Sequence, residues 1–241
     1  MTGQTKAKIF LGDDRGVNET STFQSRHTFN FGAYFNEHKN AFADLYVLND
    51  DTLAGRGDIK MLVKDYSHII LIPVAGAINY KDTDGSHHMV AAGQVKIVTA
   101  ERGTMINISN PFHEEQVNFL QIWIKAHNTD AGITTRLITY NDVNENINNI
   151  VRAFPQQEDF TELPFIISIG KFSGRGETVY LAKNTNAALY AFVIEGAFEM
   201  EGRLLHARDG LALWNIGRAE MEALSNDAII IIIELPDATA T

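Results

Sequence analysis

Short apolar segments recur along the whole chain, and this recurrence restricts the fold more than any other feature of the sequence. The segments are separated by Gly, Asn and Asp, and successive segments lie roughly 8 to 12 residues apart. Examples are "HIILIPVAGAINY", "QVKIVTA", "TMINIS", "VNFLQIWIKA", "ALYAFVIEGAFEM", "GLALWNI" and "AIIIIIEL". Segments of this length and spacing, with turn residues between them, predict an all-β sandwich or barrel.

The chain also repeats one β-unit. "PVAGAINYKD", which contains Gly76, is echoed by "FVIEGAFEME", which contains Gly196, at an offset of 196 − 76 = 120 residues, or half the chain. Each copy runs on to a further glycine, Gly93 or Gly210, which would form a turn before the next strand. Glycine suits tight turns between strands because it adopts a positive φ angle freely. Two copies of one unit predict two similar β-barrels in tandem.

Helical spacing is confined to one stretch between the two copies. The apolar side chains that would share one helical face there are Val143, Ile147, Ile150, Val151 and Phe154. We therefore expect a short helix in the connection, capped near Asn141 or Asp142.

Composition excludes several classes of function. A net charge of -10, with scattered acidic residues, gives no electrostatic attraction for nucleic acid or anionic lipid, so neither is an expected partner. Without cysteine there are no disulfides, thiolate nucleophiles or zinc-thiolate sites. The N-terminal "MTGQTKAKIF" lacks the apolar core of a signal peptide, and the run Ile229–Ile233 is too short to span a bilayer. The expected location is cytoplasmic.

Several ordered motifs in the first half resemble one family. "LGDDRG", "SRHTFNFGAYF", "LYVLNDD", "VAGAINYKD", "TAERG" and "NFLQIWI" together resemble the pirin family of bicupins, including its bacterial quercetinase-like members. The second half agrees with the family in pattern only. The resemblance implies two tandem double-stranded β-helix (jelly-roll) barrels: residues 1–140, a linker with a short helix at 141–164, and residues 165–241.

The resemblance also implies a metal site, and this chain departs from it. Family members hold one metal ion, usually iron, in the N-terminal barrel through a His-x-His pair before the first hairpin and a His and a Glu after the second. Counting from the hairpin glycine and from "TAERG" places these positions at Leu62, Lys64, Ile106 and Ile108. Shifting the first pair by one residue gives Val63 and Asp65, which restores one carboxylate at most. Because a catalytic centre needs about three protein ligands, we expect no metal, no cofactor and no catalytic residue.

The four substituted positions become candidates for a ligand pocket, with His68 nearby. An inward ammonium at Lys64 would bind an anionic ligand, pair with Asp65 or Glu101, or reach the barrel mouth. His68 lies four residues after Lys64, on the same side of a regular strand. It would act as a pocket base or hydrogen-bond a neighbouring carbonyl.

Other polar residues have simpler interpretations. His87 and His88 are adjacent, so in a strand they face opposite ways and are not expected to bind one metal ion as a pair. "PFHEEQ" (111–116) follows Asn-Pro and is interpreted as an exposed turn. Arg26 and His27 belong to a family-like motif and are interpreted as structural. In "NFLQIWI", Gln121 and Trp123 alternate with Leu120, Ile122 and Ile124, and the Trp is interpreted as core filling.

Three alternative hypotheses about function follow from these observations. The favoured hypothesis is a metal-free pirin-like cupin that binds a small anionic or apolar ligand in its N-terminal barrel, or a protein partner, with a regulatory role by analogy. The alternative is a quercetin 2,3-dioxygenase-like metal-dependent oxidoreductase with a non-standard site, recruiting His68, Asp65 or His113. A third is a metal-independent isomerase or epimerase, which would need an acid and a base facing one cavity.

Overall fold

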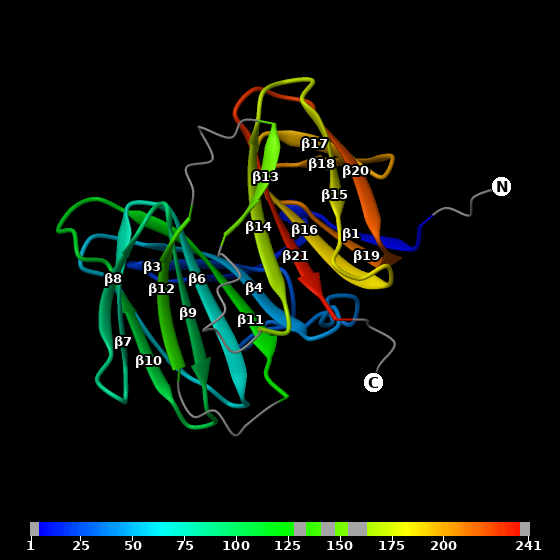
Figure 1. The fold of residues 1–241 in the computed structure, drawn as a ribbon. Coiled ribbons are helices and arrows are strands. Elements are labelled where there is room, and N and C mark those ends of the chain that lie inside the picture. Colours follow the sequence, from blue (N-terminus) through cyan, green and yellow to red (C-terminus); the bar gives the residue numbers. More distant parts are fainter. Residues whose placement is uncertain (1–4, 128–133, 141–147, 154–162, 237–241) are drawn as a thin grey trace. The chain divides into compact units, whose positions relative to one another are not determined.

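The computed structural model of the protein describes residues 5–127, 134–140, 148–153 and 163–236, and it divides the chain into two compact units. The unit Arg15–Tyr140 is called the N-terminal barrel, and the unit formed by Met1–Asp14 with Asn141–Thr241 is called the C-terminal barrel. Apart from the short 3-10 turn η1 (Gly12–Asp14), every regular element of the described residues is a strand (Figure 1). The all-β prediction is confirmed. Across the described ranges, no helix has the length and apolar character needed to cross a membrane.

The N-terminal barrel consists of two antiparallel sheets. A seven-stranded sheet has the order β12-β9-β6-β11-β4-β3-β2, and a four-stranded sheet has the order β5-β10-β7-β8. Their strands are β2 (Gly16–Glu19), β3 (Phe23–His27), β4 (Leu45–Leu53), β5 (Asp58–Leu62), β6 (Ser67–Ala75), β7 (Ala77–Asp82), β8 (His87–Ala91), β9 (Gln94–Ala100), β10 (Met105–Ser109), β11 (Val117–Lys125) and β12 (Thr134–Thr139).

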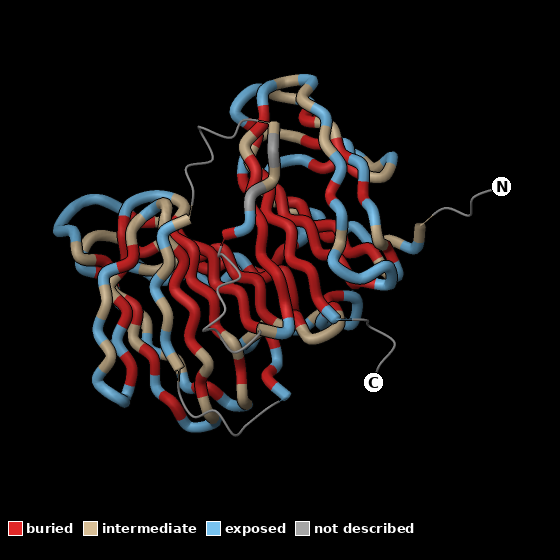
Figure 2. Tube along the Cα trace, in the orientation of Figure 1, coloured by how far each residue is buried: buried red, intermediate tan, exposed pale blue. Residues whose placement is uncertain are grey.

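Alternation along the strands builds the core of this barrel. Successive side chains of a strand face opposite ways, so every second residue enters the interior. On β11 the inward apolar residues are Val117, Phe119 and Trp123, and on β4 they are Val47 and Leu53. All five are almost fully buried. Figure 2 shows such buried positions running along the central strands of each unit. Burial of this apolar surface is the main source of stability for the barrel.

The C-terminal barrel repeats the arrangement. A six-stranded sheet has the order β1-β19-β16-β21-β14-β13, and a four-stranded sheet has the order β15-β20-β17-β18. Their strands are β1 (Ala7–Phe10), β13 (Asn149–Arg152), β14 (Ile166–Phe172), β15 (Glu177–Leu181), β16 (Ala187–Glu195), β17 (Ala197–Met200), β18 (Arg203–His206), β19 (Gly210–Ile216), β20 (Arg218–Ala223) and β21 (Ala228–Leu235).

Three of the four repeat glycines occupy turns, as predicted. Gly76 joins β6 to β7 at φ 78°, and Gly196 joins β16 to β17 at φ 77°. Gly93 precedes β9 at φ 89°. Gly210 differs, because it is the first residue of β19 and a Cβ there would overlap the phenol of Tyr190. Close side-chain approach, and not turn geometry, requires glycine at this position.

Two predictions about the connection between the barrels need correction. Residues 1–14, expected in the N-terminal barrel, belong to the C-terminal one, because β1 pairs antiparallel with β19 from Ala7↔Leu213 to Phe10↔Gly210. The predicted helix does not extend over Ile150, since β13 is a strand paired with β14. Ladder hydrogen bonds and packing of Ile150 against the core outweigh the helical spacing there. The remainder of that helix, at 141–147 and Phe154, lies outside the described residues.

Candidate ligand-binding site in the N-terminal barrel

The first pair of predicted pocket residues points away from the barrel interior. Leu62 is 51% exposed and Lys64 is also exposed, whereas Val63 between them is fully buried in the core. The prediction that Leu62 and Lys64 line the interior is therefore wrong. Residues 63–66 lie outside any strand, so alternation cannot be counted through them from Gly76. The shifted alternative also fails to supply a ligand, because Asp65 is exposed.

The second pair does face the interior. Ile106 and Ile108 are buried at 1% and 0% exposure in the core. Their partners across the β5–β10 ladder are Met61 and Ile59, which pack against the same core. The inward positions at the place where the resemblance implies a metal are therefore occupied by aliphatic and thioether side chains.

These residues do not fit the iron that the resemblance implies. Val63, Ile106 and Ile108 carry no donor atom, and iron in proteins takes imidazole, carboxylate or thiolate ligands. Within the part of the chain that the structure describes, no group of three or more His, Cys, Asp or Glu side chains could hold a metal ion.

His68 lies on the opposite face of β6 from the core residues Ile69 and Leu71. Its Nδ1 is 3.0 Å from the hydroxyl oxygen of Thr99 on the neighbouring strand β9. Burial, together with the cationic Arg136, lowers the pKa of His68 to about 4, so the ring is neutral at physiological pH. Of the two roles expected for His68, this position does not support the pocket base beside Lys64; the ring contacts a neighbouring strand, through a hydroxyl group in place of the expected carbonyl.

Lys96 on β9 does face the barrel interior, and sequence reasoning did not single it out. Its side chain is fully buried, its Nζ donates to Nδ1 of His88 at 3.0 Å, and it lies 5.1 Å from the ring centroid of Tyr80. Burial lowers the pKa of Lys96 to about 8, and the carboxylate of Asp82 opposes that shift. His88 is therefore a hydrogen-bond partner of a buried ammonium. His113, from the predicted turn, accepts from exposed Arg56 Nη2 at 2.6 Å.

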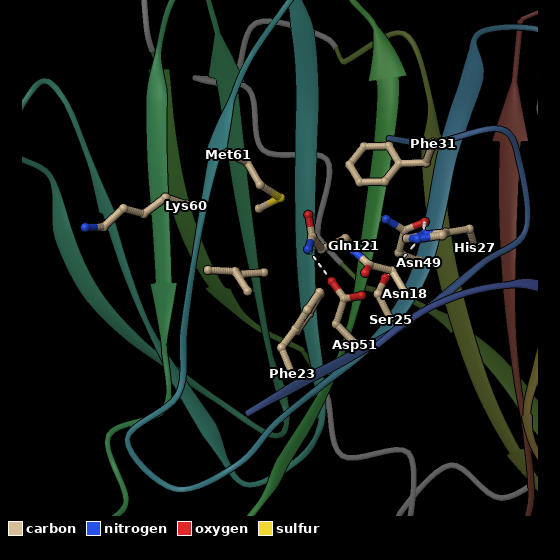
Figure 3. A pocket seen from close by; sticks show the side chains of 11 residues that line it. Asn18, Phe23, Ser25, His27, Phe31, Asn49, Asp51, Lys60, Met61 and Gln121 are labelled. Atoms are coloured by element: carbon tan, nitrogen blue, oxygen red, sulfur yellow. Dashed lines mark hydrogen bonds between the residues drawn. The ribbon is translucent and has the colours of Figure 1, made fainter. Parts of the chain in front are cut away.

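A cavity of about 200 Å³ opens inside the N-terminal barrel, between β2, β3, β4 and β11 on one side and β5 on the other (Figure 3). None of the five predicted pocket residues lines it. The lining residues are Asn18, Phe23, Ser25, His27, Phe31, Asn49, Asp51, Ile59, Lys60, Met61 and Gln121.

Strand pairing gathers the polar side chains of this cavity from distant parts of the sequence. Ser25 lies opposite Asp51, and His27 opposite Asn49, across the β3–β4 ladder. Gln121 lies opposite Asn49 across the β4–β11 ladder. Residues two apart on one strand share a face, so all five side chains enter the same interior. They form a polar wall, defined here as Ser25, His27, Asn49, Asp51 and Gln121.

Hydrogen bonds fix the orientation of this wall. The indole Nε1 of Trp123 donates to Gln121 Oε1 at 3.2 Å, and Gln121 Nε2 donates to Asp51 Oδ2. His27 Nδ1 donates to Asn49 Oδ1 at 3.0 Å and lies 3.2 Å from the hydroxyl oxygen of Ser25. Since these side chains are almost fully buried, their rotamers are held by packing as well.

Burial also changes the protonation of the wall. It raises the pKa of Asp51 to about 7, against the opposing effects of hydrogen bonds from Ser25 and Gln121. The nearby carboxylate of Asp50 adds to the rise, and Arg15 opposes it. Burial lowers the pKa of His27 below its ordinary value, so that its imidazole is neutral near pH 7.

Two buried atoms of the wall have no hydrogen-bond partner among the described residues. They are Asp51 Oδ1, in a side chain with 0% exposure, and Asn49 Nδ2, in one with 1% exposure. A buried polar group left without a partner costs about 1–3 kcal/mol. One acceptor and one donor in a single cavity are thus available to a bound molecule.

Sequence reasoning treated His27 as structural, noted only the alternation of Gln121 with its apolar neighbours, and did not consider Asn49 or Asp51. The sequence did contain an indication, because Asn49 and Asp51 share one strand face with the apolar Val47 and Leu53. Polar residues at inward positions of an otherwise apolar strand indicate a buried polar site. The partners Ser25 and Gln121 could be located only through strand pairing.

Comparisons with known proteins match both barrels. The family model described as "Pirin" matches residues 12–124, and the model described as "Quercetinase C-terminal cupin domain" matches residues 165–235. A quercetin 2,3-dioxygenase of Escherichia coli K12 is 32% identical over 125 residues, which cover 52% of this chain and 53% of that protein. The pirin-like protein YhaK of the same organism is 27% identical over 103 residues, covering 43% and 44%. The match thus spans about half the length, or less, of these relatives.

Solved structures share the fold over nearly the whole chain. The crystal structure of YhhW from Escherichia coli superposes with a TM-score of 0.84 at 20% identity, covering 96% of this chain and 98% of that one. The nickel(II) complex of the bacterial pirin YhhW gives a TM-score of 0.84 at 22% identity, covering 96% and 100%. At these identities the likeness concerns the fold alone. The two family models in succession, on this fold, show that the chain is a bicupin and belongs to the pirin family.

Proposed function

We propose that this protein is a metal-free pirin-like cupin that acts by binding a small molecule in the cavity of its N-terminal barrel. One observation carries the proposal: Asp51 and Asn49 line one cavity of about 200 Å³, and their buried atoms Oδ1 and Nδ2 have no partner within the described part of the chain. A cavity that combines apolar side chains with a few polar groups held in fixed orientation is suited to binding a small molecule.

The chemistry of the inward residues favours binding over metal-dependent oxidation. Relatives of the chain are named quercetin 2,3-dioxygenases, and one solved pirin holds nickel(II). Here the inward side chains at the corresponding place are Met61, Val63, Ile106 and Ile108. Three of these side chains are aliphatic and have no donor atom, and the single thioether of Met61 cannot replace imidazole and carboxylate ligands, so a dioxygenase of that type would lack its metal ligands.

The ligand is proposed to be uncharged. The expected anionic ligand depended on Lys64, which is exposed. The buried carboxyl group in the cavity, Asp51, would repel an anion whenever it is ionised. Lys60 lines the cavity rim, and Figure 3 shows its ammonium pointing away from Asp51.

The test combines metal content with enzyme activity. Protein purified without chelator is analysed by plasma mass spectrometry, and oxygen uptake with quercetin is followed with iron, copper or nickel added. We expect trace metal only and oxygen uptake at the background rate. One metal ion per chain after dialysis, or quercetin-dependent oxygen uptake, would overturn the proposal.

A further inference from the structure

We propose that the cavity recognises a neutral single-ring phenol that carries a second, hydrogen-bond-accepting substituent. The phenol hydroxyl donates to Asp51 Oδ1, and the second substituent accepts from Asn49 Nδ2. This inference rests on the proposed function and adds the chemical class of the ligand.

The hydrogen bonds around Asp51 indicate that the ligand must offer a hydrogen-bond donor. An indole N–H can only donate, so Trp123 fixes Gln121 with its Oε1 towards the indole and its Nε2 towards the carboxyl group. Gln121 Nε2 therefore donates a hydrogen bond to Asp51 Oδ2. The second oxygen, Oδ1, is buried without a partner among the described residues, and it can be satisfied by a hydroxyl or N–H group of the ligand.

Asn49 indicates in the same way that the ligand must also offer a hydrogen-bond acceptor. Its Oδ1 accepts from His27 Nδ1 at 3.0 Å, and its Nδ2 is a buried donor for which the described residues offer no acceptor. Asn49 and Asp51 are two residues apart on β4, so their Cα atoms are separated by about 7 Å on one face of the strand. Two substituents placed apart on one six-membered ring match two groups at such a separation better than a single hydroxyl does.

The apolar residues that line the cavity favour an aromatic ring in the ligand. Phe23, Phe31, Ile59 and Met61 line the cavity beside the polar wall. Aromatic and thioether side chains pack favourably against aromatic rings. A cavity of about 150 Å³ is known to hold benzene. The cavity here, at about 200 Å³, therefore has room for one ring with small substituents.

The negative charge of Asp51 disfavours ligands of this class that are themselves anions. Asp51 faces the cavity, and its pKa of about 7 leaves it substantially ionised at neutral pH. His27 is neutral there, because burial lowers its pKa. A benzoate would bring a second negative charge next to Asp51, whereas a ketone or amide substituent supplies the acceptor without charge.

Isothermal titration calorimetry at pH 8 with the full chain tests the inference. The probe is 3-hydroxyacetophenone, and the matched control ligand is 3-methoxyacetophenone, which keeps the ring and the ketone but cannot donate. We expect the hydroxyl probe to bind about tenfold or more tightly than the methyl ether, which corresponds to one hydrogen bond to a charged group.

The Asp51→Asn variant provides the second arm. Asn can keep an oxygen towards Gln121 and place an amide N–H where the free carboxyl oxygen was, so an acceptor becomes a donor without a change of shape. The variant should bind the hydroxyl probe about tenfold or more weakly, with little effect on the methyl ether. Asp58→Asn, the same change on an exposed residue of β5, should leave both affinities unchanged. Circular dichroism verifies folding, and the comparison of the two ligands on the wild type needs no variant.

Each outcome decides the inference. Equal affinity of the two probes for the wild type would overturn it, and so would an unchanged affinity of Asp51→Asn for the hydroxyl probe. Absence of binding by both probes at millimolar concentration would also overturn the ligand class, but with trace metal content the proposed function would stand. One metal ion per chain would overturn both.

Discussion

Gln121 on β11 donates its Nε2 hydrogen to the Oδ2 atom of Asp51 on β4, inside the N-terminal barrel. The two residues are 70 positions apart in the chain. Trp123 sets the orientation of the amide by donating its indole hydrogen to Gln121 Oε1. This connection places a carboxyl group in the cavity of the barrel, and one of its oxygens, Oδ1, has no hydrogen-bond partner among the described residues.

Replacing Gln121 should destabilise the barrel. Gln121→Leu removes the donor to Asp51 and the acceptor of the Trp123 indole, so two buried polar groups lose a partner. We expect the free energy of unfolding to fall by about 2 kcal/mol or more in urea denaturation. Gln24→Leu, on the outward face of β3, should change it by less than about 0.5 kcal/mol. Similar losses for both variants would contradict the role given to Gln121.

The stability of the protein should depend on pH through Asp51. The ordinary pKa of 3.8 applies to the unfolded chain, while burial raises the pKa to about 7 in the folded state. Between these values the folded protein keeps a proton that the unfolded chain has lost, so the contribution of Asp51 falls as pH rises through this window. Above pH 7 the cost reaches at most about 4 kcal/mol.

Urea denaturation from about pH 4 to about pH 8 measures this effect. The difference in unfolding free energy between wild type and Asp51→Asn should decrease steadily across that range, because Asn does not titrate. The exposed control Asp58→Asn should follow the wild-type curve. Parallel curves for wild type and Asp51→Asn would show that the carboxyl group titrates normally.

A metal site should be recoverable only at the inward positions. The variant Met61→His, Val63→His, Ile106→His, Ile108→Glu places three imidazoles and a carboxylate on side chains that face the core. We expect it to retain nickel or iron at about one ion per chain after dialysis, by plasma mass spectrometry. Metal binding would also raise its melting temperature, since only the folded chain presents the site.

The matched control moves the first pair to the outward positions. Leu62→His, Lys64→His, Ile106→His, Ile108→Glu contains the same four ligands, but Leu62 and Lys64 are exposed, so the site stays incomplete. This control should hold trace metal only. Stoichiometric metal in the control and not in the first variant would reverse the assignment of inward residues.

The C-terminal barrel offers a test of close packing. A Cβ at Gly210 would overlap the phenol of Tyr190, and both residues are buried. Gly210→Ala should therefore cost about 1–3 kcal/mol of stability, seen as a lower melting temperature. In a Tyr190→Phe background the cost should be smaller, because the hydroxyl oxygen is the nearest atom. An unchanged melting temperature of Gly210→Ala would contradict the packing argument.

The sequence alone determined the fold class, the tandem repeat and the family. These depend on local patterns: apolar segments of strand length, turn residues between them, and glycines such as Gly76 and Gly196 at positive φ. The apolar nature of Ile106 and Ile108 was equally readable, because "TAERG" is close in the chain. Local spacing is preserved over such short distances, so counting from a motif succeeds there.

Tertiary structure decided which side chains face the interior before the first hairpin. The count from Gly76 back to Leu62 crosses residues 63–66, which are in no strand, and a register shift in β6 opposite Asn118 and Phe119. An irregularity of one residue turns every following side chain to the other face, so Val63 is inward where Leu62 and Lys64 were expected.

Tertiary structure also assembled the cavity. Ser25, Asp51 and Gln121 meet only because β3, β4 and β11 are neighbours in one sheet, and hydrogen-bonded pairing between strands distant in sequence leaves no local pattern. Likewise β1 joins the C-terminal barrel by pairing with β19, far along the chain. Local propensities specify that strands form, whereas the free energy of burying their inward faces decides which strands become neighbours and which polar groups they enclose.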